Sequence, residues 1–198
     1  MPTEENKPDP SYWDDLYRNQ ETAWDLGYVS TPLKEYFDQL TNKHQSILIP
    51  GCGNSYEAEY LLSKGFTNIT VIDISPLLTE RLKNKFGTRY KNELTILTGD
   101  FFSLKGQFDL IIEQTFFCAL DPTLRKEYAE QIKKLLKPGG KLAGVFFDRE
   151  FPEGPPFGGN MEEYRMLFIP HFEILKMERC YNSIAPRKNT EVFIIMKK

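Results

Sequence analysis

Short apolar runs recur through the middle of the chain, and more polar segments with helical spacing of apolar residues separate them. The runs cover Ile47–Pro50, Ile69–Ile72, Leu94–Leu97, Phe108–Ile112 and Lys141–Phe147. Residues within each run are mostly apolar in succession rather than alternately, which predicts strands that are buried on both faces, as in a parallel sheet. The chain is therefore expected to form an α/β domain with helices on both sides of the sheet.

Residues typical of helix ends bound the segments between the runs. The expected helices cover about 11–19, 31–41, 55–64, 75–86 and 122–136. Thr31-Pro32 combines a capping side chain with a proline suited to the first helical turn, and Gly65 suits a C-terminal cap. A Lys-Pro-Gly-Gly stretch at 137–140 ends the last of these helices.

The alternation of strands and helices stops near residue 148. A loop rich in proline and glycine (151–159) and a helix (161–168) lead to two strands, 172–179 and 191–196, with no helix between them. Such a pair should add one antiparallel strand to the sheet. The predicted fold is a Rossmann-like three-layer α/β sandwich, with a seven-stranded, mostly parallel sheet and an antiparallel C-terminal strand.

Composition narrows the class of protein. The chain has 198 residues and a net charge of −3, with no block of like charges, which argues against nucleic acid as the main partner. No apolar run approaches 18 residues, so no membrane span is expected. The first ten residues are polar and acidic and are expected to be disordered; they are unlike a signal peptide, which makes the cytoplasm the default location.

The cysteines and histidines do not suggest a metal site or a disulfide framework. Cys52, Cys118 and Cys180 are odd in number, and none is spaced as a CxxC pair. His44 and His171 lie outside the motifs described below. We therefore expect no bound metal and small buried thiols.

The turn after the first strand carries the clearest sign of a ligand. Gly51 and Gly53 allow the backbone to approach a ligand closely, but Tyr56 stands where dinucleotide-binding loops have a third glycine. The ligand should therefore be a nucleoside without a pyrophosphate. Asp73 lies 22 residues beyond Gly51, at the end of the second strand, where an acidic residue binds ribose hydroxyls.

Polar residues also end the next two strands. Asp100 could reach an adenine amine, Phe101 offers a backbone N–H and a flat ring face, and Glu113 is expected to face the same crevice. Each residue alone has an ordinary explanation, such as a cap, a turn or an ion pair. Their occurrence at successive strand ends favours a cofactor site, because these ends meet at one edge of a parallel sheet.

Several motifs resemble those of known enzymes. The segments I-L-I-P-G-C-G-N, V-I-D-I-S, G-D-F-F and L-L-K-P-G-G resemble the ordered motifs of class I S-adenosylmethionine-dependent methyltransferases, over about 46–148. The segments Y-W-D-D-L-Y-(x)6-W-D-L-G (12–27) and E-Q-T-F-F-C-A-L-D-P (113–122) resemble the thiopurine S-methyltransferase family. Within it, G-P-P-F (154–157) is similar to an element of the thiol/halide methyltransferase branch.

The resemblance implies S-adenosyl-L-methionine as cofactor and S-adenosyl-L-homocysteine as product. It implies these cofactor-binding residues: Trp13, Tyr17 and Trp24 as a cover, Gly51 and Gly53 in the loop, Asp73 on the ribose, Asp100 and Phe101 on the adenine, and Glu113 near the methionine portion or the acceptor. Aromatic rings attract a sulfonium cation, although the tryptophans could also simply cover the core. It further implies one domain, with N-terminal lid helices (1–45), a cofactor-binding core (46–148), and an acceptor loop, helix and C-terminal hairpin (149–198).

The expected reaction is an in-line methyl transfer, and the acceptor is left open. Glu113 and Asp148 are the candidate bases, and the scarcity of histidine suits an acceptor that ionises readily, such as a thiol, a thiopurine or a halide. Arg149 and Arg187 could attract an anion, but a solvated surface position is the favoured interpretation. The alternatives are an O- or N-methyltransferase, an aminopropyl-type transferase, or a non-catalytic binder of the cofactor. A monomer acting on a small molecule is favoured.

Overall fold

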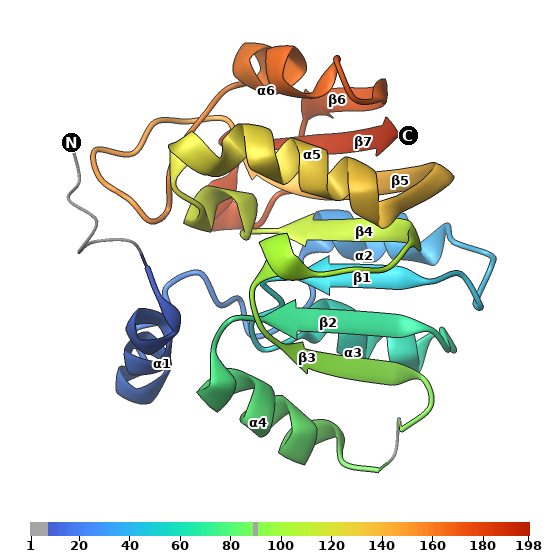
Figure 1. Ribbon diagram of the computed structural model, residues 1–198. Helices are drawn as coiled ribbons and strands as arrows, with labels where there is room; N and C mark the ends of the chain where they lie inside the picture. Colours follow the sequence, from blue (N-terminus) through green and yellow to red (C-terminus); the bar gives the residue numbers. More distant parts are fainter. Residues whose placement is uncertain (1–7, 89–90) are drawn as a thin grey trace.

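A computed structural model describes residues 8–88 and 91–198; most of the N-terminal segment expected to be disordered lies outside these ranges. The described strands form one seven-stranded sheet in the order β3-β2-β1-β4-β5-β7-β6 (Figure 1). The strands are β1 (Ile47–Pro50), β2 (Ile69–Asp73), β3 (Leu94–Thr98), β4 (Phe108–Gln114), β5 (Leu136–Phe147), β6 (Glu173–Arg179) and β7 (Glu191–Lys197). The helices are α1 (Pro10–Asn19), α2 (Thr31–Asp38), α3 (Tyr56–Ser63), α4 (Pro76–Phe86), α5 (Arg125–Leu135) and α6 (Met161–Phe168).

The sheet has the predicted directions. Strands β1 to β5 pair in parallel, and β7 runs antiparallel to both β5 and β6. The expected Rossmann-like α/β fold with an antiparallel C-terminal strand is therefore confirmed. Strand β1 lies between β2 and β4, so the order of strands reverses there, and ligands of such sheets bind beside the carboxyl ends of the strands at this point.

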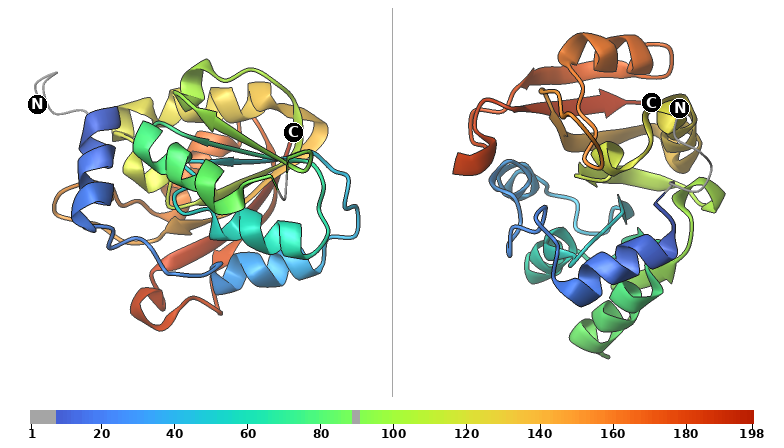
Figure 2. Two further views of the ribbon diagram at one scale, coloured as in Figure 1. Left: turned by 90° about the horizontal axis from the view of Figure 1, so that it is seen from below. Right: turned by 90° about the vertical axis from the view of Figure 1, so that its left-hand side faces the viewer.

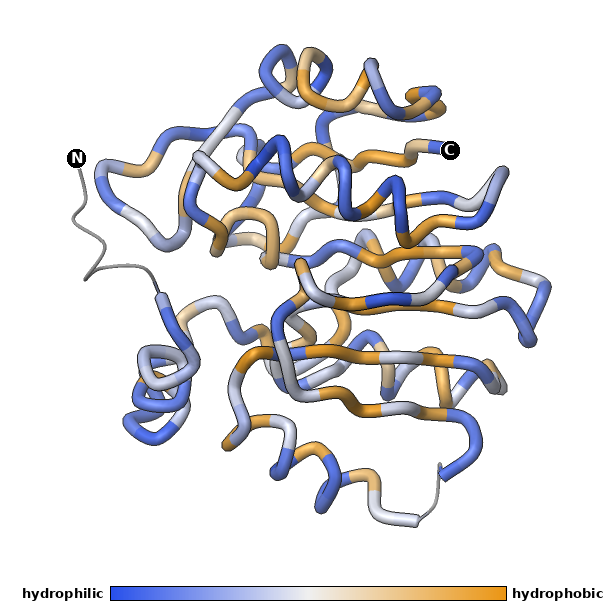
Figure 3. The backbone as a smooth tube through the Cα atoms, viewed as in Figure 1, coloured by the Kyte–Doolittle hydropathy of each residue, from blue (hydrophilic) through white to orange (hydrophobic). Residues whose placement is uncertain are grey.

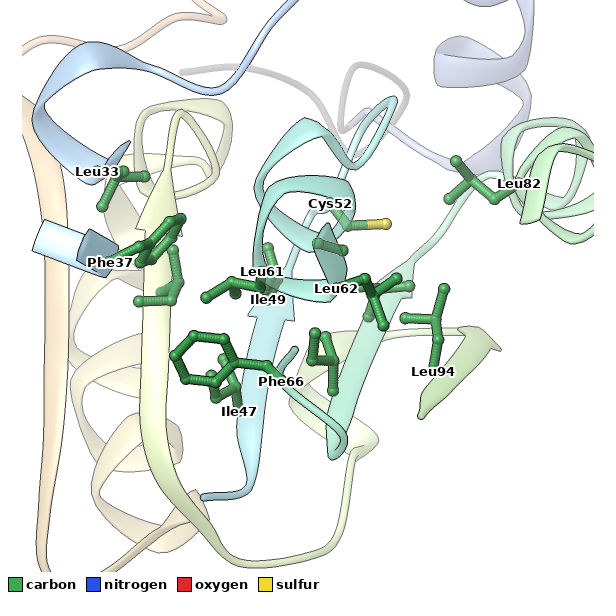
Figure 4. Packing of buried hydrophobic residues seen from close by; sticks show 14 of the residues in the cluster. Leu33, Phe37, Ile47, Ile49, Cys52, Leu61, Leu62, Phe66, Leu82 and Leu94 are labelled. Carbon is green, nitrogen blue, oxygen red and sulfur yellow. The ribbon is translucent and has the colours of Figure 1, made fainter. Parts of the chain in front are cut away.

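Each face of the sheet carries its own apolar core. Ile47 and Ile49 of β1 point toward α2, α3 and α4, whereas Leu48 points toward α5 and α6. Figures 1 and 2 show α5 on the opposite side of the sheet from α2 and α3, and Figure 3 shows that apolar residues follow the central strands. Figure 4 shows Leu33 and Phe37 of α2 in the first of these cores. Burial on both faces explains the continuous apolar runs.

Three element boundaries differ from the predicted ones by three residues or more. Helix α2 ends at Asp38 rather than near residue 41, and the segment 122–124 is a 3-10 turn before α5. Strand β5 begins at Leu136 rather than Lys141, because Leu136 pairs with Phe108 before the register shifts. A Cβ on Gly140 would lie 3.0 Å from the Phe108 carbonyl oxygen. The lack of a side chain at Gly140 therefore allows the irregular pairing of β5 with β4, in addition to any role in ending the preceding helix.

The two N-terminal helices occupy different places. Helix α1 lies beside α4 at the edge of the molecule, near the carboxyl ends of the strands (Figure 1). Helix α2 packs against α3 and β5, where Leu33 and Phe37 are fully buried. Within the described ranges, no helix combines the length and the apolar character that crossing a membrane requires.

Candidate active site

A cavity of about 670 Å³ lies at the carboxyl ends of the strands. Its walls come from the turns after β1, β2, β3, β4 and β5, from the β6–β7 connection, and from the segment 8–28, which we call the lid. The residues of the predicted cofactor set that line it are Trp13, Tyr17, Trp24, Gly51, Gly53, Asp73, Asp100 and Phe101. The structure therefore brings together eight residues from four separate segments of the chain.

The glycine turn after β1 has the conformation that requires glycine. Gly51 and Gly53 have φ of +54° and +49°, which side chains disfavour. A Cβ on Gly51 would lie 2.2 Å from Cδ2 of Phe116, so the Phe116 ring packs directly on this turn. The turn is thus shaped both by its own backbone and by the loop that follows β4.

Asp73 lies at the end of β2 with its carboxylate fixed by backbone donors. Its Oδ2 accepts a hydrogen bond from Gly53 N (3.2 Å), and its Oδ1 accepts one from Ser75 N (3.0 Å). Burial raises the pKa of Asp73, while these two N–H groups lower it. Each carboxylate oxygen has a second lone pair, so both can still accept from neighbouring ribose hydroxyls.

The residues after β3 offer polar groups for an adenine. Asp100 is exposed and caps a short 3-10 turn, because its Oδ1 accepts from Phe102 N (3.0 Å). Phe101 is 4% exposed, and its ring packs against Phe116 and Tyr128 with centroids 5.2 and 5.7 Å apart. The ring face expected to meet the adenine is therefore turned into the core, which leaves the backbone of Phe101 as the available group.

The lid places three aromatic side chains over the cavity. Trp24 makes edge contacts with Trp13 and Tyr17, at centroid distances of 5.6 and 5.9 Å. The Tyr17 hydroxyl lies 3.5 Å from the position of a Cβ on Gly53. Burial, together with the nearby charge of Asp73, raises the pKa of Tyr17, so this phenol stays neutral. Neutral rings of this kind can cover a cationic ligand and exclude water from it.

The prediction that Glu113 faces the crevice is wrong. Side chains alternate along a strand, and Glu113 points with Ile111 toward α5 rather than into the cavity. Its Oε1 accepts from Phe116 N (2.8 Å) and Phe117 N (2.9 Å), and its Oε2 accepts from the Tyr128 hydroxyl (2.8 Å). Burial raises the pKa of Glu113 to about 7. The residue supports the loop that forms the cavity wall and does not contact the cavity.

Asp148 is also placed outside the cavity. Its side chain is 14% exposed and lies 3.6 Å from Arg179 Nε, and it does not line the cavity. The reason is again alternation, because its neighbours Phe147 and Arg149 both line the cavity. Both carboxylates proposed as bases are therefore directed elsewhere.

Two arginines line the end of the cavity away from the Asp73 carboxylate. Arg149 is exposed, with its guanidinium 4.5 Å from the centre of the Phe151 ring. The Arg187 side chain is only 11% exposed; its Nη2 donates to the Trp24 carbonyl (2.9 Å), and its Nη1 lies 3.5 Å from Glu191 Oε1. The interpretation of Arg187 as a solvated surface residue is therefore wrong. We call this region, with Phe147, Phe151 and the two arginines, the acceptor end.

Other cavity residues were missed by the sequence reasoning. Asn54 and Tyr56 both bond Asp25 of the lid, the Tyr56 hydroxyl at 3.4 Å from Asp25 Oδ2. Phe116 lies within a motif that had been noted, but its contact with Gly51 joins segments far apart in the sequence. The only available signal for these residues was their position directly after a strand or a glycine turn.

The cavity residues fit an adenosyl amino acid. A buried carboxylate at the end of β2, a glycine turn and an exposed Asp100 supply groups for ribose, backbone contacts and adenine, and the lid supplies aromatic rings. Tyr56 occupies the place of the third glycine and lines the cavity, as a site without a pyrophosphate would allow.

Comparison with known proteins agrees with this fit. The family model described as "Thiopurine S-methyltransferase (TPMT)" matches residues 8–197. The protein named "Probable thiol methyltransferase 2" from Arabidopsis thaliana is 33% identical over 184 residues, covering 90% of this chain and 81% of the relative. "Thiocyanate methyltransferase 1" from Brassica oleracea is 28% identical over the same shares of both chains.

A solved structure shares the fold. The 1,6-didemethyltoxoflavin-N1-methyltransferase of Burkholderia thailandensis, which contains bound S-adenosylhomocysteine, superposes with a TM-score of 0.75 at 17% identity. The match covers 96% of this chain and 86% of that chain. The family match over residues 8–197 and the relative at 33% identity show that the chain belongs to the thiopurine S-methyltransferase family and is an S-adenosylmethionine-dependent methyltransferase.

Proposed function

We propose that the protein methylates the sulfur of a small nucleophile that reacts as an anion, a thiolate or thiocyanate. The observation that carries this proposal is the pair of arginines at the acceptor end. Arg149 and Arg187 bring positive charge to a region otherwise bounded by Phe147 and Phe151. Apolar walls with a few cationic groups suit a small, weakly hydrated anion. The names of the relatives point to the same chemical class.

The chain's own residues can do three things in this reaction. S-Adenosylmethionine, when bound, supplies a methyl group on a positively charged sulfur. The lid rings exclude water, which keeps the acceptor anion reactive. The arginines favour the ionised form of a bound thiol, because a nearby cation lowers the pKa of an acidic group. The glycine turn and Asp73 fix the position of the methyl donor, which in-line displacement requires.

Neither carboxylate proposed as a base reaches the cavity, so neither is placed to take a proton from a bound acceptor. Glu113 is bonded to Phe116, Phe117 and Tyr128, and Asp148 lies beside Arg179. We further propose that the eight lining residues named above are the cofactor contacts, with residues 46–148 as the cofactor-binding core and 149–198 contributing to the acceptor site. A monomeric, cytoplasmic enzyme without nucleic-acid partners completes the proposal.

The test is an acceptor panel with labelled donor: an alkyl thiol, an aromatic thiol, thiocyanate, iodide, a phenol and an amine. We expect methylation of the sulfur acceptors. The rate with thiols should rise as pH approaches the pKa of the thiol, whereas the rate with thiocyanate should stay flat, because thiocyanate has no proton to lose. Methylation of the phenol or the amine alone would contradict the proposal.

A double variant tests whether the positive charge of Arg187 contributes to binding of the anion. Arg187→Met combined with Glu191→Gln removes a buried ion pair as a unit, so that neither charge is left alone. We expect KM for thiocyanate to rise by about tenfold, which is the effect of losing one charged contact. An unchanged KM for thiocyanate would assign the anion site elsewhere.

A further inference from the structure

Helix α1 of the lid and helix α4 of the core cap each other. Asp14 Oδ1 accepts hydrogen bonds from Ser75 Oγ and from Leu77 N (3.2 Å), at the N-terminus of α4. In return, Arg81 Nη1 of α4 donates to the Tyr17 carbonyl oxygen (3.2 Å), near the C-terminus of α1. Both contacts have the favourable sign, an anion at a helix N-terminus and a cation near a C-terminus.

Ser75 connects this junction to the cofactor site. Its hydroxyl donates to Asp14 and also accepts from Leu78 N (3.0 Å), which makes it the N-cap of α4. Its backbone N–H donates to Asp73 Oδ1 (3.0 Å). One residue therefore joins the carboxylate of the lid to the carboxylate at the end of β2. A shift of Asp14 would therefore reach Asp73 through two hydrogen bonds of the same residue.

The Asp14 contact also sets the rotation of α1 about its own axis. Trp13 and Tyr17 are four residues apart and share one helical face, which lines the cavity. Asp14 lies between them in sequence and points to α4 instead, with its side chain 14% exposed. Fixing Asp14 on α4 thus turns the aromatic face of α1 toward the cavity.

We propose that Asp14 is a positioning residue that docks the lid onto α4 and thereby sets the lifetime of the bound cofactor. A docked lid keeps Trp13 and Tyr17 over the cavity and Asp73 in register with Gly53. Lid docking and cofactor binding then strengthen each other. By linkage, docking raises the cofactor's binding constant by the same factor by which bound cofactor raises the equilibrium constant for docking. Asp14 does not line the cavity, so it acts on binding and release through the residues that do.

The proposal rests on the proposed function only through the cofactor, and its test needs no methyl acceptor. Asp14→Ala is compared with Asp15→Asn, the matched control. Both native carboxylates pair with Arg18 on their own helix, Asp14 at 3.7 Å, but the Asp15 side chain is exposed. Release of S-adenosylhomocysteine is followed by stopped-flow fluorescence. The chain's two tryptophans, Trp13 and Trp24, both lie in the lid, so their emission reports the lid alone.

We expect Asp14→Ala to release S-adenosylhomocysteine about tenfold faster, the size expected for losing a helix cap coupled to a ligand. Acrylamide should quench its tryptophans more, and bound S-adenosylhomocysteine should restore protection. Asp14→Asn keeps an acceptor oxygen for Leu77 N and should fall between the wild type and Asp14→Ala. Asp15→Asn should match the wild type in both measurements.

Unchanged release and quenching in a folded Asp14→Ala would overturn the proposal, as would an equal effect of Asp15→Asn. Should Asp14→Ala fail to fold by circular dichroism, Arg81→Met removes the reciprocal contact with the Tyr17 carbonyl and leaves Asp14 intact. We expect it to accelerate release in the same direction, and unchanged release in that variant would equally overturn the proposal. An inactive enzyme that shows these shifts would count against the proposed acceptor only.

Discussion

At one end of the cavity, the proposed cofactor end, Gly51, Asp73 and Asp100 lie at the ends of three neighbouring strands, and backbone groups hold the Asp73 carboxylate. At the acceptor end, Arg149 and Arg187 come from loops, and their guanidiniums rest on the phenylalanine rings of 151 and 147. The hydrogen-bonded ladders of the sheet fix the positions of residues at the ends of its strands, whereas loops can change without disturbing the sheet. If the proposed assignment of the two ends holds, this difference would let one scaffold keep its methyl donor while the acceptor site varies.

The largest effect is expected on the free energy of unfolding, at the buried Glu113. This side chain supports the loop after β4, which forms part of the cavity wall. The pKa of Glu113 is raised from 4.5 to about 7, so between these values the folded state holds a proton that the unfolded state has lost. The protonated Glu113 therefore stabilises the folded state fully below pH 4.5, and about 3 kcal/mol of this stability is lost as the pH rises through 7. Glu113→Gln cannot ionise and should lack this dependence.

The measurement is urea unfolding of the wild type and Glu113→Gln at pH 5 and pH 8. The difference between the two proteins cancels the other titrating groups, and it should move in favour of the variant at pH 8. A difference that stays constant with pH would show that Glu113 titrates normally in the folded protein.

The next prediction separates the cofactor end from the acceptor end. Asp73→Ala removes the acceptor of the Gly53 and Ser75 N–H groups and the partner for ribose, so S-adenosylmethionine should bind about 100-fold more weakly, or about 2.7 kcal/mol. Calorimetry measures the affinity. Asp100→Asn, which retains an oxygen to cap the turn at Phe102, is the milder comparison and should lose less. Normal affinity of Asp73→Ala for S-adenosylmethionine would contradict the proposal that Asp73 contacts the cofactor.

The smallest effect is expected at Arg149. Its guanidinium is exposed and contacts the Phe151 ring, so Arg149→Gln should leave the stability almost unchanged. We expect KM for an anionic acceptor to rise by about threefold to tenfold, with no change in the affinity for S-adenosylhomocysteine. High salt should reduce the difference between the wild type and the variant. A weaker cofactor affinity in this variant would mean that the two ends are not separate.

The cofactor end was predictable from the sequence because it follows from strand order. Apolar runs located the strands, and the residue after each run had to lie at one edge of the sheet, which is why Asp73 and Asp100 were found together. Glu113 shows the limit of this reasoning, since a shift of one residue along a strand reverses the direction of a side chain. The run of apolar residues located the end of β4 but not which side chain would face the cavity.

The acceptor end could not be predicted in this way. Arg187 enters the cavity because the β6–β7 connection folds back to the Trp24 carbonyl, a contact between the two ends of the chain. Nothing in the local sequence marks such a contact. The same holds for the Gly51–Phe116 contact, in which a ring from one loop occupies the space left by a glycine in another.

Strand β6 lies at one end of the sheet, where unpaired backbone groups can recruit a strand from a second molecule. Its ladder with β7 is interrupted between Ile174 and Lys176, and it carries Glu173, Lys176, Glu178 and Arg179 among its seven residues. Charges and an irregular ladder make a poor template for a further strand. Growth of the sheet by intermolecular pairing is therefore discouraged at this edge.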